Sequence, residues 1–112
     1  MLARRAFTLI EVLVAIVLVE LGLLTSVAAV AILFRAAAEG RLATAAAHRA
    51  ASRLETLRES PCQPASGVTA GPFRESWTAT APHNGVRSLS DSVEYRASGR
   101  LKTVVLRTRD LC

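Results

Sequence analysis

Several residues and motifs on which catalysis and metal binding depend are missing from this chain. It has 2 histidines and 2 cysteines in 112 residues, and neither His48 nor His83 has a second histidine or cysteine at ligand spacing. There is no C-x-x-C pair, so the sequence contains neither a zinc motif nor a thiol redox motif. The serines of residues 88–92 lack the G-x-S-x-G or S-x-x-K context of a nucleophile. We therefore expect no enzyme, no metal and no cofactor.

Proline and charge are both scarce in the first half of the chain. No proline precedes Pro61, and the only charged residues between Phe7 and Phe34 are Glu11 and Glu20. As a helix with a rise of about 1.5 Å per residue, this stretch would be roughly 42 Å long, which exceeds a hydrocarbon core of about 30 Å. The apolar region of a secretory signal peptide has only about 7–15 residues. The stretch is therefore interpreted as a membrane-spanning helix.

Flanking charges and the cysteines indicate how this span is oriented. Arg4 and Arg5 lie just before it in a very short tail, which places the N-terminus in the cytoplasm and the residues after Arg35 outside. Outside the cytoplasm a disulfide persists, and two cysteines allow one pairing, Cys62 with Cys112. Closing a loop of about fifty residues would stabilise the fold by roughly 4 kcal/mol. The alternative is two unrelated thiols.

Helix-forming residues continue beyond the span. Residues 35–60 are rich in Ala, Leu, Glu and Arg, which favour helix. Their apolar positions recur at spacings of three and four, as in an amphipathic helix: Leu42, Ala46, Ala50, Leu54 and Leu57. Pro61 ends the helix, because proline lacks an amide hydrogen and disfavours helix at the residue before it. Residues 7–60 are thus predicted to form one continuous helix.

After Pro61 the sequence pattern changes from helix to strand. Residues 61–72 are rich in Pro, Gly and Ser and predict a loop. Residues 73–80, 86–97 and 101–108 predict three strands joined by turns at Asn84-Gly85 and Ser98-Gly99, and the polar residues 88–92 predict a bend in the second strand. So small a sheet needs the amphipathic helix as cover. The expected fold class is α+β, a long N-terminal helix packed on a small antiparallel sheet of about three strands.

The residues at the start of the span form a motif. Residues 4–15 read RRAFTLIEVLVA, and this order resembles the prepilin N-terminal motif of type IV pilins and type II secretion pseudopilins. In that family a prepilin peptidase cuts just before a phenylalanine, the new amino group is methylated, and a glutamate is fifth in the mature chain. The resemblance implies cleavage between Ala6 and Phe7, N-methylation of Phe7, and an assembly role for Glu11. The family usually has glycine at the position of Ala6.

This resemblance also implies an organisation and a set of partners. Residues 1–6 would be the prepilin leader, 7–34 the transmembrane and assembly helix, 35–60 its amphipathic continuation and 61–112 the small β domain of a pilin-like fold. The chain would cross a bacterial inner membrane once, with its C-terminal domain in the periplasm, and would then enter a filament with other pilin or pseudopilin subunits. Main pilus subunits often carry a proline in the span. Its absence here favours a minor pilin or pseudopilin.

Two acidic residues inside an apolar span need compensation, because a buried carboxylate is costly unless it is paired or near water. For Glu11, the resemblance implies pairing with the new amino group at Phe7 of an adjacent subunit; the alternative is a glutamate at the membrane interface that reaches water. Glu20, nine residues further on, points to roughly the opposite helix face. It is protonated, meets a particular neighbour in the assembly, or marks a loosened helix next to Gly22.

A basic run near the C-terminus suggests a second kind of protein, an uncleaved single-pass membrane-anchored domain that binds a partner such as DNA. Phosphates are attracted to such clusters, here Arg96, Arg100, Lys102, Arg107 and Arg109. Asp91, Glu94 and Asp110 are interleaved with these cations, which favours a solvated face over a nucleic-acid site. The structural-subunit interpretation is therefore preferred.

Overall fold

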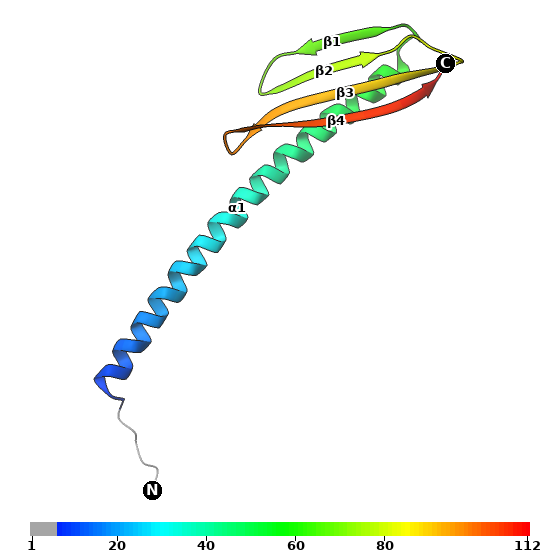
Figure 1. Ribbon diagram of the computed structural model, residues 1–112. Helices are drawn as coiled ribbons and strands as arrows, with labels where there is room; N and C mark the ends of the chain where they lie inside the picture. Colours follow the sequence, from blue (N-terminus) through cyan, green and yellow to red (C-terminus); the bar gives the residue numbers. More distant parts are fainter. Residues whose placement is uncertain (1–6) are drawn as a thin grey trace. The chain divides into compact units, whose positions relative to one another are not determined.

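A computed structural model describes residues 7–112 (Figure 1). Helix α1 (Leu9–Glu59) is followed by four strands, β1 (Ala65–Thr69), β2 (Phe73–Ala79), β3 (Val86–Ala97) and β4 (Arg100–Leu111). The strands form one antiparallel sheet in the order β1-β2-β3-β4. The expected α+β class with one long N-terminal helix is confirmed, and the sheet has four strands where about three were predicted.

The chain divides into two compact units, which meet between Ala36 and Ala37 within α1. In the first unit every described residue is exposed, including all of its large apolar side chains. No proline interrupts the helix, and its hydrogen bonding continues through Gly22 and Gly40. The first unit is therefore a helical segment whose described apolar side chains are all exposed.

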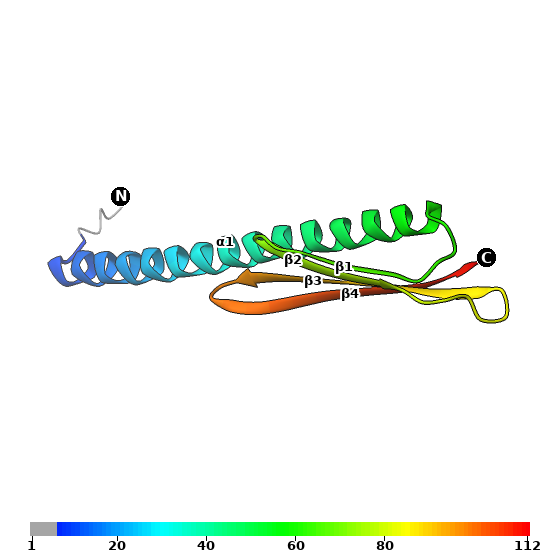
Figure 2. The same cartoon turned by 90° about the horizontal axis from the view of Figure 1, so that it is seen from above.

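In the second unit the sheet lies along one side of the C-terminal half of α1 (Figures 1 and 2). Ala46 and Ala50 are completely buried where the helix meets the sheet, as are Leu89 and Val93 on the strand side. The small alanine side chains let the helix lie close to the strands. The predicted amphipathic face of residues 35–60 is this contact surface.

Strand β1 lies in the segment predicted to be a loop, so that prediction is wrong for Ala65–Thr69. The strand has little apolar alternation, and it is held by pairing with β2, in which Gly67 lies opposite Trp77. A Cβ atom on Gly67 would lie 2.1 Å from the Trp77 ring. The indole therefore occupies the space that a side chain would take, and glycine marks a close approach here.

Strand β3 runs without a bend through residues 88–92, so the predicted bend is also wrong. Alternate residues of β3 face the helix and are buried, and two of them are charged, Arg87 and Asp91. Those charges break the apolar alternation by which a strand is recognised. Both predicted turns are confirmed: Asn84 and Gly85 have φ of 52° and 75°, and Ser98 and Gly99 have 51° and 73°, as tight hairpin turns require.

Candidate functional site

The helix start contains a capping box formed by Thr8 and Glu11. The Thr8 hydroxyl accepts a hydrogen bond from the Glu11 backbone N–H at 3.3 Å, and Glu11 Oε2 accepts one from the Thr8 backbone N–H at 3.2 Å. The pair supplies side-chain acceptors for two backbone donors at the helix start, and the Glu11 N–H also donates to the Thr8 carbonyl at 3.0 Å. A carboxylate in the first turn also interacts favourably with the helix dipole. The signal for this box, Thr-x-x-Glu before an apolar run, is local and could have been recognised in the sequence.

Phe7 lies just before this cap, and its side chain is 81% exposed. Of the predicted cleavage pair, Phe7 is described, whereas Ala6 and the rest of the predicted leader, residues 1–6, lie outside the described residues. The structure thus brings Phe7, Thr8 and Glu11 together at the helix start. One oxygen of Glu11 bonds to Thr8, and Oε1 accepts no hydrogen bond from any of residues 7–112.

Glu11 and Glu20 border one shallow groove on the first unit, with Val12, Ala15 and Val19 between them. Nine residues at about 100° each place Glu20 roughly 180° around the helix from Glu11. The two acids therefore lie on the two sides of this apolar strip. Helix α1 continues past Gly22, whose carbonyl accepts bonds from the hydroxyls of Thr25 at 2.9 Å and Ser26 at 2.8 Å. The alternative of a helix that loosens beside Glu20 therefore has no counterpart in the structure.

Among residues 7–112, α1 is the one helix long and apolar enough to cross a membrane, and none of its most apolar window is buried. An exposed apolar surface of this length is unfavourable in water, since apolar area is stabilised only when it is removed from solvent. Length, composition and exposure make this segment a candidate single membrane span.

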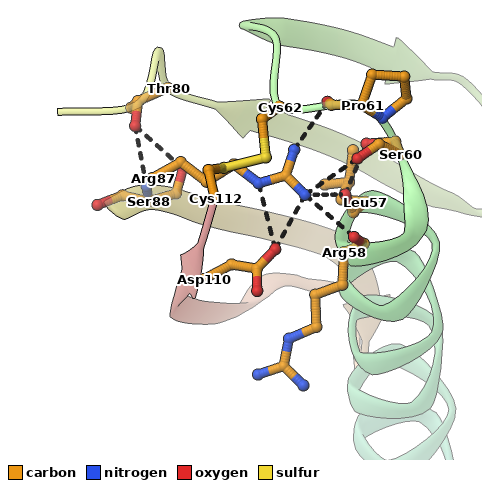
Figure 3. The surroundings of a disulfide bond; sticks show 10 residues. All are labelled: Leu57, Arg58, Ser60, Pro61, Cys62, Thr80, Arg87, Ser88, Asp110 and Cys112. Atoms are coloured by element: carbon orange, nitrogen blue, oxygen red, sulfur yellow. Dashed lines mark hydrogen bonds and ion pairs between the residues drawn. A yellow bond between two sulfur atoms is a disulfide. The ribbon is translucent and has the colours of Figure 1, made fainter. Parts of the chain in front are cut away.

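At the far end of α1, the predicted disulfide joins Cys62 to Cys112, with Cα atoms 6.0 Å apart (Figure 3). Cys62 lies just after the helix, and Cys112 follows β4 and donates its backbone N–H to the carbonyl of Gly85 at 2.9 Å. The bond therefore closes a loop that contains all four strands. This predicted pairing is confirmed.

Arg87 on β3 lies beside the disulfide and was not identified from the sequence. Its side chain is 1% exposed, and its guanidinium pairs with Asp110, with Nη2 3.0 Å from Oδ2 (Figure 3). The same guanidinium donates to backbone carbonyls at the end of α1 and just beyond it, those of Leu57, Arg58, Ser60 and Pro61. A helix end leaves carbonyls without partners. Arg87 satisfies them and so fixes the helix end to the sheet.

A second charged cluster lies between the helix and the middle of the sheet. Arg53 Nε donates to Glu75 Oε1 at 2.9 Å, and the Arg53 guanidinium lies over the Trp77 ring at 4.2 Å. Glu75 and Asp91 are 4% and 1% exposed, and neither oxygen of Asp91 has a hydrogen-bond donor among the described residues. Burial, and then the negative charge of Glu75, raise the pKa of Asp91 from 3.8 to about 6.

Because the folded state holds this proton more tightly than the unfolded state, stability is expected to fall as pH rises from about 4 to about 6. Asp91→Asn should remove this dependence and raise the free energy of unfolding at pH 7 by at most about 3 kcal/mol, because the pKa of Asp91 is raised from 3.8 to about 6 and each unit corresponds to about 1.4 kcal/mol. The Asn amide can donate to Glu75. Denaturant unfolding at pH 4 and pH 7 measures both effects. The exposed Glu55→Gln is the control. Equal stability of Asp91→Asn and wild type at pH 7 would contradict this.

The basic run does not form one surface. Arg96, Arg107 and Arg109 are exposed on the sheet face turned away from α1, whereas Lys102 is half-buried and its Nζ bonds to Glu39 Oε2 at 2.9 Å. Within residues 7–112, no three His, Cys, Asp or Glu side chains lie close enough to hold an ion. His48 and His83 belong to no such group.

Comparisons with protein families, with curated proteins and with solved structures find no match to this chain. Its function is therefore inferred from its own residues, above all those at the start of α1.

Proposed function

We propose that the chain is a structural subunit, of the minor class, of a type IV pilus or type II secretion pseudopilus filament, made as a prepilin and processed by prepilin peptidase. The observation that carries this proposal is the exposed apolar segment of α1, which begins at a capped start directly after Phe7. The resemblance of residues 4–15 to prepilins supplies the family. The work of such a subunit is assembly.

The physical basis of assembly is the uncovered apolar surface of residues 7–34. Lipid covers such a surface in a membrane, and the helices of neighbouring subunits can cover it in a filament, so the segment is suited to both environments. Beyond its capped first turn, a continuous helix pairs its own backbone groups in either environment. The second unit carries its own buried core and its own disulfide, and in the proposed topology it lies in the periplasm.

The proposal is tested at the N-terminus of the protein isolated from membranes of cells that contain a prepilin peptidase. Mass spectrometry should find a chain that begins at N-methylated Phe7. Cells without the peptidase are the control, and Ala6→Gly should be processed at least as well as wild type. A chain that keeps Arg4 and Arg5 in the presence of active peptidase would sink the proposal and favour the uncleaved membrane-anchored binding domain.

The role of Glu11 can be separated into its charge and its cap. Glu11→Gln keeps a side-chain oxygen for the Thr8 N–H but removes the charge, whereas Thr8→Val keeps the charge and loses the hydroxyl of the cap. If the amino group of a neighbouring Phe7 pairs with Glu11, Glu11→Gln should be processed normally and enter filaments at least tenfold less well. Thr8→Val should lose about 1 kcal/mol of helix stability and still be incorporated.

Sheared filaments, quantified by immunoblot against the membrane fraction, give the measure for both variants. Normal incorporation of Glu11→Gln together with failure of Thr8→Val would show that the cap, and not the charge, is what assembly needs.

A further inference from the structure

Glu20 lies in the middle of the apolar segment, where its own chain offers no cation. No Lys or Arg occurs between Arg5 and Arg35. At about 1.5 Å per residue, Arg35 lies roughly 22 Å from Glu20 along the axis, and the Phe7 end lies roughly 20 Å away in the other direction. Neither distance can be bridged by a side chain of the same helix. A cation that pairs with this carboxylate would therefore come from another chain.

The surface next to Glu20 is suited to a second helix. The groove between Glu11 and Glu20 is lined by Val12, Ala15, Ile16 and Val19, and every one of these residues is exposed. Ala15 is small and lies between larger neighbours, so a helix can approach the backbone there as small residues allow in membrane helix pairs. An apolar strip bordered by a carboxylate on each side fits a helix that is apolar and carries positive charge.

A count of charges indicates that this helix is not a copy of the same chain. A subunit processed before Phe7 brings one amino group into the apolar layer, but it brings two carboxylates, Glu11 and Glu20. Glu11 already has the Thr8 cap and the positive end of the helix, and the proposed function gives it the amino group of a neighbour. An assembly of identical copies would leave one carboxylate per subunit without a cation in a medium where that is costly.

We infer that the groove between Glu11 and Glu20 docks the apolar helix of a different subunit, one with a Lys or Arg at the depth of Glu20. The inference rests on the proposed function in that the segment is taken to meet the helices of other subunits. A charge-assisted pair is strong where water is absent and has a defined geometry. Glu20 would thus select which subunit lies next to this one.

The probe is the full chain with Glu20→Lys, which presents a cation at the required depth in an otherwise identical helix. Donor-labelled wild type and acceptor-labelled Glu20→Lys are reconstituted into phosphatidylcholine vesicles, and energy transfer between their C-terminal tags measures association. Wild type should bind the probe about tenfold more tightly than Glu20→Gln does, in line with polar pairs between membrane helices. Wild type should also bind the probe more tightly than it binds a second wild-type copy.

Two controls keep the result specific. Leu18→Lys places the cation about 160° around the helix from position 20, next to Val14, and it should bind wild type no better than wild type binds itself. Carbonate extraction verifies insertion, and the double variant Glu20→Gln/Leu24→Lys replaces the probe if Glu20→Lys fails to insert.

Equal binding of the probe by wild type and Glu20→Gln would overturn the inference. A second result would also overturn it: if wild type associates with itself more tightly than Glu20→Gln associates with itself, the occupant of the groove is a second copy of the chain. Mass analysis of the N-terminus in the same vesicles reports processing separately, so a failure of the proposed function is distinguishable from a failure of the Glu20 pairing.

Discussion

Replacing Arg87 with leucine should lower the free energy of unfolding by about 4 kcal/mol, because removing one member of a buried ion pair costs roughly 3–5 kcal/mol. Asp110 would lose its cation, and the carbonyls at the end of α1 would lose a donor that is itself 1% exposed. Arg87→Lys should recover less than half of the loss, since an ammonium group cannot match the planar fork of the guanidinium.

Denaturant unfolding in detergent, followed by tryptophan emission, gives this measurement directly. The chain has one tryptophan, Trp77, which packs against Gly67 and Arg53 and therefore reports on the sheet. Arg107→Leu is the matched control, because Arg107 lies exposed on the opposite face of the sheet. A loss no larger for Arg87→Leu than for this control would mean that the cap of the helix end does not stabilise the fold.

Removing the disulfide with Cys62→Ser and Cys112→Ser together should cost a similar amount, about 4 kcal/mol, for a loop of about fifty residues in the chain-entropy model. The bond holds the segment after α1 against the end of β4, and Arg87 holds the same two segments together through Pro61 and Asp110. The two devices therefore act at one junction.

Two interactions at one junction should not act independently. Arg87→Leu in the background of the double serine variant should cost at least 1 kcal/mol less than it does in the oxidised wild type, since neighbouring sites couple by roughly 0.5–3 kcal/mol. Unfolding of the four proteins under identical conditions completes the cycle. Strict additivity would show that the cap and the disulfide stabilise different parts of the domain.

The features that follow from local chemistry could be predicted from the sequence. The span needs only a run of apolar residues, and the end of the helix needs only Pro61. Each hairpin turn needs two residues that adopt positive φ, which Asn84-Gly85 and Ser98-Gly99 supply. The disulfide followed from the count of two cysteines and the expected compartment. None of these features depends on what lies across the interface.

The features that were missed depend on contacts between distant segments. In the sequence, Gly67 indicates a loop, because glycine is rare in strands. In the structure Trp77 fills the space beside Gly67, a contact that the five residues of β1 do not reveal by themselves. Arg87 and Asp91 read as solvent-facing in isolation. The inward position of Arg87 is stabilised by the carbonyls at the end of α1. The inward position of Asp91 is unfavourable for its charge, because it is buried next to a second carboxylate, Glu75 on β2.

Some residues of the candidate site could also be identified from the sequence, and other features of it could not. Phe7, Glu11 and Glu20 were identified from a motif and from the rarity of charge in an apolar run. The Thr8 cap has a local signal in the sequence, whereas the groove that joins the two acids becomes visible only once the helix is built. The acid at position 11 thus has a role within its own chain in addition to the one proposed between chains.

The disulfide sets an order of events for biogenesis. One of its cysteines precedes β1 and the other follows β4, so the native bond cannot form until all four strands have been made. In the topology proposed above, it forms only after all of them have reached an oxidising compartment. If the proposed export stalled within the sheet, Cys62 would stay a free thiol. In the proposed topology, an oxidant of that compartment takes two electrons from the Cys62 and Cys112 thiols together, so the disulfide would mark a domain that has been fully exported. A thiol-reactive label on membrane-bound chains would then distinguish chains with the bond from chains without it.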